Sequence, residues 1–457
     1  MEFLNILGLV IAVAVLVVGA YKGLGALPLA LLASLVVIVT NQLDPWPALA
    51  ASPLATGGAA RSFMAGYTNA YLAFFLMLAS AALYARFMDV SGSAMAVGYK
   101  FIDWFGRKRV LLVSTLIVSA LTYGGVSLFV VVFAVMPILF VLFKEANLPR
   151  HLTMAPLVLG SSTYTMTSLP GTPALTNLIP SQFLGTPLTA APVMGLVAAI
   201  IIFIVGYIYM VYAEKKARAN KENWEFPSHI DPSFYEIKDK SLLPHPVIAF
   251  LPMVILLATI IIGSQFINPE GLIRNATMLA VFAMLFATVL VILLNQPRLK
   301  GKSYKELVTK GLEGGISGIG GLAAVLGFGA VVSGTPAFAA IVQWVLGLDA
   351  HTYVQAAIST MVVAAVTGSS SGGLNIMYGE FAATFLAVPD LNLEVLHRIS
   401  SLFAGTLDTL PHSPGIFLTF AVMGLNHKNS YVHVFFTSVV GTTLAAVIML
   451  IVGVVAF

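Results

Sequence analysis

The sequence predicts an all-α polytopic membrane protein built from two inverted-topology repeats, and three observations support this fold class. Of the 457 residues, 59% are hydrophobic and only 9% are charged, whereas soluble domains average roughly 45–50% apolar and roughly 25% charged residues. Many apolar runs reach the roughly 20 residues that a helix needs to cross the bilayer, without the short alternating segments of a β-barrel. Short polar motifs also recur in the two halves of the chain.

The apolar runs define the expected elements along the chain. They lie near residues 4–21, 24–41, 68–88, 110–144, 151–186, 189–212, 245–264, 275–294, 306–331, 352–388, 391–425 and 430–456. Four of the runs are too long for one simple crossing, and each is interrupted near its middle by polar residues or glycines. These are 110–144, 151–186, 352–388 and 391–425. Broken backbone at membrane depth is tolerated only where it is buried in protein or lines a wet cavity.

Charges in the loops predict the topology, because Lys and Arg mark the cytoplasmic side. The run 110–144 has basic residues at both ends, whereas 352–388 has acidic flanks. We therefore expect two re-entrant hairpins that enter from opposite sides. With these hairpins the chain makes about ten crossings, with both termini outside and every basic loop inside.

Three motifs recur in the same order at an offset of about 240 residues, which indicates a duplication. They are "TSLPGTP" (167–173) and "DTLPHSP" (408–414), the hairpin tips that begin at Thr122 and Thr367, and "VSG" (90–92 and 332–334). The topology places the two copies upside down relative to each other. Inverted repeats with paired broken helices are typical of secondary transporters, whose site lies near the midplane where the breaks meet.

The repeats predict three parts of the chain. Residues 1–213 form the first repeat, with the hairpin 110–144 and the broken helix 151–186. Residues 214–243 form a cytoplasmic linker, which contains the only long hydrophilic stretch. Residues 244–457 form the second repeat, with the hairpin 352–388 and the broken helix 391–425.

The breaks are expected to bind a small carboxylate that carries hydroxyl groups. A broken helix points free N–H groups and the positive end of its dipole into the break, and the interruptions add hydroxyl donors. The predicted substrate-binding residues are Thr122, Gly124, Gly125, Ser127, Thr165, Thr167, Ser168, Gly171, Thr172, Ser369, Ser370, Ser371, Gly372, Thr409, His412 and Ser413. The alternative is that these small residues only allow close helix packing.

Asp408 and His412 are the ionisable residues of the second break, and the first copy of the motif has Thr167 and Gly171 at these positions. Ionisable groups at this depth usually mark an ion or proton pathway. We expect His412 to bind the substrate carboxylate or the coupling proton, with Asp408 as its partner or as the proton carrier. Glu380 is a further candidate for proton coupling. An Asp408–His412 pair that only locks the loop is the structural alternative.

Three segments carry a resemblance to a known family: "FGRKRVLL", "VMPILFVLFKEANLPR" and above all "GTLDTLPHSPGIFLTFAVMGLNHKNSY". They resemble the gluconate permease (GntP) family of proton-coupled sugar-acid and hydroxy-acid symporters, within the ion transporter superfamily. The last segment is most similar to the branch that transports short hydroxy acids such as 3-hydroxybutyrate. The resemblance implies a carboxylate substrate, a bacterial inner-membrane location, and an elevator-like movement on a homodimeric scaffold.

Other functions are left open or excluded by the residues. A sodium-coupled or antiporting transporter of the same superfamily is one alternative, because unwound carbonyls can also bind Na⁺. An intramembrane hydrolase that uses Ser370 or Ser371 with His412 is a distant one. No nucleotide-binding motif stands in its required context and no cysteine is present, so we expect no enzyme activity, cofactor or metal. The small formal net charge of +4 argues against a nucleic-acid partner. His397 and Arg398 are expected to lie at the membrane interface.

Overall fold

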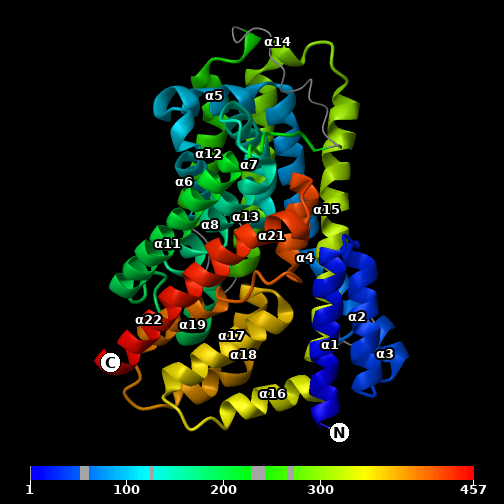
Figure 1. Cartoon of the computed structure of the whole chain (residues 1–457), viewed down its shortest axis with the longest axis vertical. Helices are drawn as coiled ribbons and strands as arrows, with labels where there is room; N and C mark the ends of the chain where they lie inside the picture. The colour runs from blue at the N-terminus through cyan, green and yellow to red at the C-terminus, as the bar shows by residue number, and fades with distance from the viewer. Residues whose placement is uncertain (1, 52–60, 124–127, 228–241, 265–271) are drawn as a thin grey trace.

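The computed structural model describes residues 2–51, 61–123, 128–227, 242–264 and 272–457. The described residues fold into helices, and no strand occurs among them (Figure 1). Within these ranges, five helices are long and apolar enough to cross a membrane: Phe3–Tyr21, Phe63–Val90, Leu128–Glu145, Pro192–Ala219 and His427–Ala456. Shorter apolar helices accompany them. The prediction of an all-helical polytopic membrane protein is therefore confirmed.

One group of helices comes from the start of each half of the chain. It comprises α1 (Glu2–Tyr21), α2 (Ala26–Thr40), α3 (Pro45–Ala50), α4 (Phe63–Val90), α5 (Ser93–Phe105), α12 (Pro246–Ser264), α13 (Leu272–Leu294), α14 (Gln296–Leu299), α15 (Tyr304–Ser333) and α16 (Pro336–Leu346). Within the group α1 packs on α2 and α12 packs on α13. In addition, α2 packs against α15, and α13 packs against α4.

Helices α4 and α15 cross antiparallel with their backbones in close contact. A Cβ atom built on Gly66 of α4 would lie 2.6 Å from the carbonyl oxygen of Leu326, and one on Gly327 of α15 would lie 2.8 Å from that of Phe63. At the other end of the crossing, a Cβ on Gly315 would lie 2.8 Å from the Cα of Ala79. Glycine is thus required at both ends, because small residues let membrane helices approach closely.

The second group holds the interrupted segments. It comprises η1 (Arg107–Arg109), α6 (Val110–Tyr123), α7 (Leu128–Glu145), η2 (Arg150–Thr153), α8 (Met154–Ser161), α9 (Tyr164–Thr167), α10 (Leu175–Leu184) and α11 (Pro192–Ala219). It continues with α17 (Thr352–Thr367), α18 (Ser370–Leu386), α19 (Leu393–Ala404), α20 (Pro414–Met423), α21 (His427–Val434), the π-helical turn η6 (Phe435–Val440) and α22 (Gly441–Ala456). The pair α6 and α7 and the pair α17 and α18 each pack together.

Local sequence explains where these helices begin and end. Ser369 caps α18, because its hydroxyl accepts the N–H of Gly372 at 3.1 Å, and Asn392 caps α19 in the same way. Gly368, at φ +62°, ends α17 in a left-handed conformation that costs glycine little. Pro414 stands at the first position of α20, where its missing N–H is not needed. The breaks therefore follow from cap and turn residues.

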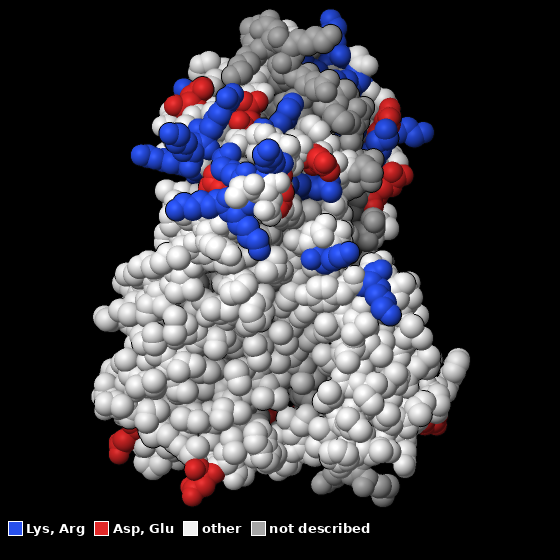
Figure 2. Space-filling view, in the orientation of Figure 1, with Lys and Arg blue, Asp and Glu red and all other residues white. Residues whose placement is uncertain are grey.

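Charged side chains lie unevenly on the molecule. In the view of Figure 2, Lys and Arg gather in the half that contains α5 and α14, while the visible charges at the opposite end are acidic. The broad band between is almost free of charge. This distribution is typical of a protein whose middle faces lipid.

Candidate functional site

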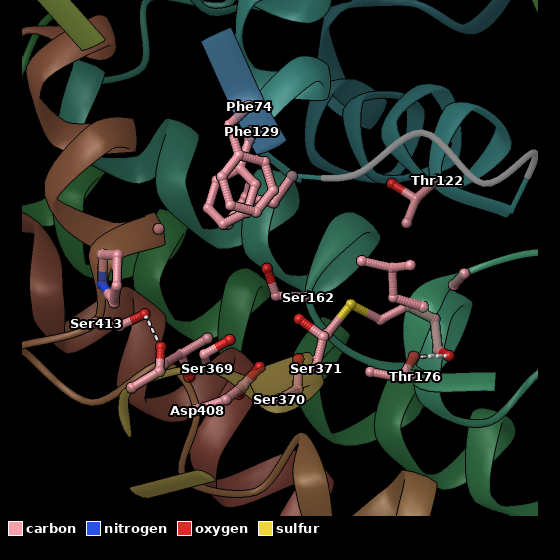
Figure 3. A pocket seen from close by; sticks show the side chains of 18 of the residues that line it. Phe74, Thr122, Phe129, Ser162, Thr176, Ser369, Ser370, Ser371, Asp408 and Ser413 are labelled. Carbon is pink, nitrogen blue, oxygen red and sulfur yellow. Dashed lines mark hydrogen bonds between the residues drawn. The ribbon is translucent and has the colours of Figure 1, made fainter. Parts of the chain in front are cut away.

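A cavity of about 120 Å³ lies where the two hairpins, both breaks and the crossing helices α4 and α15 meet. Its volume far exceeds the roughly 10–15 Å³ that one water needs. It is lined by Phe74, Thr122, Leu128, Phe129, Ser162, Met166, Ala174, Leu175, Thr176, Leu326, Gly368, Ser369, Ser370, Ser371, Asp408, Thr409, Ser413, Pro414 and Gly415. The lining combines a hydroxyl-rich wall with an apolar one. Figure 3 shows Ser369, Ser370, Ser371 and Asp408 together on one side and the rings of Phe74 and Phe129 opposite.

The tip of the second hairpin supplies the serines. Ser369 turns back to cap α18, while Ser370 and Ser371 begin that helix and line the cavity. Ser413 fixes the tip against the second break, because its hydroxyl donates to the carbonyl of Gly368 at 2.9 Å (Figure 3). A Cβ on Gly368 would lie only 3.0 Å from the Cα of Ser413. The hairpin tip and the break therefore form one surface.

Asp408 is the only charged side chain among the described residues that line this cavity. It is 5% exposed, and its Oδ1 has no hydrogen-bond partner in the described structure. The Ser370 hydroxyl and the backbone N–H of Thr409 face the carboxyl group. Thr409 in turn donates to Ser438 of the π-helical turn at 2.9 Å. A buried carboxyl oxygen without a partner is costly and is available to a ligand.

His412 lies beside the cavity but does not line it. Its Nε2 donates to the carbonyl of Ala365 on α17 at 2.8 Å, and its buried Nδ1 has no partner within the described residues. The ring therefore links the second break to the first arm of the hairpin. Asp408 and His412 form no ion pair with each other among the contacts of the described chain.

The first break contributes less to the cavity than the sequence predicts. Of its five predicted residues, none lines the cavity. The hydroxyls of Thr165 and Thr167 donate to the carbonyls of Gly160 and Thr163, and that of Thr172 donates to the carbonyl of Tyr123. The Ser168 hydroxyl lies 3.2 Å from that of Thr167. Gly171 is a turn residue at φ +83°. The hydroxyls of Thr165 and Thr167 thus serve the local backbone, as those of Ser and Thr in helices often do, while that of Thr172 joins the break to the first hairpin.

The remaining predicted residues fall into three groups. Thr122 lines the cavity. Gly124, Gly125 and Ser127 lie outside the described residues. Gly372 gives its N–H to the Ser369 cap, and Glu380 is exposed on α18 away from the cavity.

Several lining residues escape the sequence pattern. Ser162 and Thr176 lie on either side of the predicted binding residues Thr165 to Thr172, and their hydroxyl type alone gives a weak signal. Phe74 on α4 and Phe129 on α7 carry no signal, because nothing local distinguishes them from the many other aromatic residues of apolar helices. Long-range packing alone brings them to the site.

The expectation that Arg398 lies at the interface is wrong, because it is fully buried. Its Nε and Nη2 donate to the carbonyl of Ala190 at 3.2 and 2.8 Å, and its Nη1 donates to the carbonyl of Thr167 at 3.2 Å. Helix α19 thus holds the end of α9 and the start of α11. On the same helix, the carboxylate of Glu394 accepts a hydrogen bond from the N–H of Ala191 at 3.0 Å.

His397 is also fully buried, against the same expectation. Its Nε2 lies 2.9 Å from the amide oxygen of Asn177, and its Nδ1 lies 2.7 Å from the hydroxyl of Thr186. Because an amide oxygen only accepts, Nε2 donates, and in the neutral ring Nδ1 then accepts the Thr186 hydroxyl. Ser401, one turn on, donates to the carbonyl of Thr176 at 2.8 Å. Helix α19 therefore joins the two breaks through buried hydrogen bonds.

The arrangement suits an anion that can share a proton. The N-termini of α18 and α20 both begin at the cavity, where free N–H groups and helix dipoles favour negative charge. Among the described lining residues there is no Lys, Arg or His. Hydroxyls and backbone would therefore neutralise a ligand only in part, and Asp408 would oppose an anion unless it is protonated.

The chain resembles known transport proteins. No family model matches it. The chain is 32% identical over 406 residues to the "Uncharacterized transporter YxjC" of Bacillus subtilis (strain 168), a match that covers 83% of this chain and 85% of that protein. A solved structure titled "Structure and Function of Neisseria gonorrhoeae MtrF Illuminates a Class of Antimetabolite Efflux Pumps" aligns with a TM-score of 0.41 at 14% identity, over 99% of this chain and 94% of that one.

Proposed function

This chain belongs to the same family as the Bacillus subtilis transporter YxjC and is a transporter rather than an enzyme; from that premise we propose that it imports a small hydroxy-carboxylate by proton symport. The observation that supports this proposal best is the buried Asp408 carboxyl group in a cavity otherwise lined by hydroxyls, helix N-termini and apolar side chains. Such a cavity favours an anion of a few heavy atoms with a polar and an apolar side.

Proton coupling follows from the charge of the cavity. A substrate carboxylate beside an ionised Asp408 would place two like charges in a site of low polarity, and such a pair does not ionise fully. One proton on Asp408 removes the repulsion and turns its unpartnered oxygen into a donor. In this proposal the proton binds first, the substrate follows, and the two cross together.

Hydroxyl groups and helix ends recognise the substrate in this proposal. Ser370 and Ser371 begin α18, and Ser413 precedes α20. The Ser371 hydroxyl and the backbone N–H groups at these helix starts would bind the carboxylate of the ligand. The Ser413 hydroxyl donates its proton to Gly368, so it would accept from a hydroxyl group of the ligand. Phe74 and Phe129 would contact its carbon chain, since they form the opposite wall (Figure 3).

Helix contacts support the proposal of two inverted repeats, 1–213 and 244–457, joined by the linker 214–243. The contact of α2 with α15 has its counterpart in that of α13 with α4, and the contact of α1 with α16 has its counterpart in that of α12 with α5. These exchanges are what a two-fold relation between halves requires. In Figure 1 the α6–α7 pair lies nearer the end with α14, and the α17–α18 pair lies nearer the end with α16.

The orientation in the membrane and the membership of a family are part of the same proposal. The half rich in Lys and Arg (Figure 2) would face the cytoplasm of a bacterial cell, with both termini outside and the protein in the inner membrane. Membership of the gluconate permease family, elevator-like movement and a homodimeric scaffold complete the proposal. They rest on the sequence resemblance.

Uptake into proteoliposomes tests the proposed function. Labelled 3-hydroxybutyrate and gluconate would be offered under an inward proton gradient or an inward sodium gradient. We expect the proton gradient to drive accumulation of at least one of these acids. Accumulation driven by sodium alone would replace the proton by Na⁺ in the proposal. No movement of either acid under either gradient would refute the carboxylate substrate.

A further inference from the structure

A second cavity, of about 360 Å³, shares no lining residue with the cavity at the two breaks, which is called the transport cavity below. Three segments form it: the start of η2, the chain after α11, and the turn from α20 into α21. Its lining residues are Pro149, Arg150, His151, Lys221, Glu222, Asn223, Glu225, Gly424, Leu425, Asn426, Asn429 and Ser430. Its wall is therefore mostly polar, in contrast to the transport cavity.

Two side chains of this wall have buried donors without acceptors. Ser430 is fully buried, and its hydroxyl has no partner within the described structure. The Nε and Nη1 groups of Arg150 are likewise buried and lack a partner among the described residues. Buried donors without acceptors are rare in proteins, and here they come from two segments that border one cavity.

The cavity also lies at the N-terminus of a long helix. Asn426 caps α21 by accepting the N–H of Asn429 at 3.1 Å, and the helix continues through η6 and α22 to Ala456. The positive end of its dipole favours an anion there. The unpartnered donors of Arg150 and Ser430 are an independent observation that points to the same kind of ligand.

Charges of the wall allow an anion. Arg150 and Lys221 contribute two positive charges, and Glu222 and Glu225 two negative ones. The Glu222 carboxylate is already held by His151, with an Nε2 to Oε2 distance of 2.6 Å. Glu225 lies close enough to Arg150 to attract it, yet Nε and Nη1 stay unbonded. Those two N–H groups, the Ser430 hydroxyl and Lys221 are left for a ligand.

We propose that this cavity binds a small oxyanion, a phosphate or carboxylate group, through Arg150, Ser430 and the N-terminus of α21. The group could belong to a free anion or to a lipid headgroup. Asn426, which lines the cavity, directly precedes His427, the first residue of α21, whose Nε2 donates to the carbonyl of Pro411 at 2.8 Å. The site would therefore neighbour the second break, although its binding does not depend on the proposed transport function.

Calorimetry on the detergent-solubilised full chain tests the proposal without any transport assay. The probes are inorganic phosphate, acetate, and a short-chain phosphatidic acid, so that free anions and a lipid headgroup are distinguished. We expect saturable binding of at least one probe. Arg150→Gln should weaken it at least about tenfold and Ser430→Ala about threefold to tenfold, as lost hydrogen bonds to an anion predict.

Arg107→Gln is the matched control, because Arg107 is an exposed arginine that pairs with Glu145 at 2.8 Å and does not line the cavity. We expect this variant to bind the probes as the parent does. Failure of all three probes to bind would overturn the proposal. Equal binding by the parent, Arg150→Gln and Ser430→Ala would overturn it as well, since the anion would then bind elsewhere.

Discussion

Replacement of Arg398 by methionine is expected to destabilise the protein by about 2–6 kcal/mol, because two buried carbonyl groups lose their partner. Arg398 donates three hydrogen bonds to the carbonyl oxygens of Ala190 and Thr167. Each unsatisfied buried carbonyl costs about 1–3 kcal/mol. Methionine fills much of the same volume, so little cavity cost is added. The loss of the buried positive charge, which no described carboxylate pairs, offsets part of this cost, so we expect a value in the lower part of this range.

Equilibrium unfolding in mixed micelles with increasing sodium dodecyl sulfate measures this free energy. Ser401→Ala is the comparison on the same helix, where one hydroxyl bonded to the carbonyl of Thr176 is lost, at an expected cost of about 0.5–1.5 kcal/mol. The two variants should therefore differ clearly. A loss below about 1 kcal/mol for Arg398→Met would refute the conclusion that this side chain holds the two breaks together.

Two further predictions concern the helix crossing and the loop after α11. Gly66→Ala should destabilise the protein by about 1–3 kcal/mol through overpacking, since its Cβ would lie 2.6 Å from the carbonyl oxygen of Leu326. Gly320→Ala should leave the stability unchanged, because no atom lies within 4 Å of its Cβ. Equal effects of the two variants in the same unfolding assay would contradict the contact. Hydrogen bonds from Asn220 and then His151 hold the pKa of the Glu222 carboxyl group below its ordinary value of 4.5. The stabilisation that Glu222 contributes is therefore present above that value and is lost as the pH falls through the lowered pKa. Glu222→Gln should flatten stability over that acid range, and an unchanged pH profile would exclude this role.

The second break could be predicted from the sequence, while much of the first could not. Ionisable residues and glycine in "GTLDTLPHSPG" indicate a break that lines a cavity, and Asp408, Thr409 and Ser413 do line one. The same argument fails for Thr165 and Thr167, because local carbonyls accept their hydroxyls. Side chain direction depends on this local competition, which the residue type does not reveal.

Buried polar residues outside the breaks were the least predictable part. Arg398 stands six residues after the cap of α19 at Asn392, and charged residues near a helix start usually face the membrane surface. Its burial depends on the chain around Ala190 folding over α19, a contact far apart in sequence. The contribution of Phe74 to the cavity depends in the same way on the crossing of α4 and α15.

The most direct test of the central claim, that Asp408 carries the coupling proton, is to compare net uptake with exchange in Asp408→Asn proteoliposomes. Asparagine resembles a protonated aspartate in shape and in its lack of charge. We expect the variant to lose accumulation driven by a proton gradient, yet to exchange labelled for unlabelled substrate, because exchange needs no release of the proton. Asp103→Asn, at an exposed position on α5, should retain both activities. Accumulation by Asp408→Asn at the parent rate would contradict the claim.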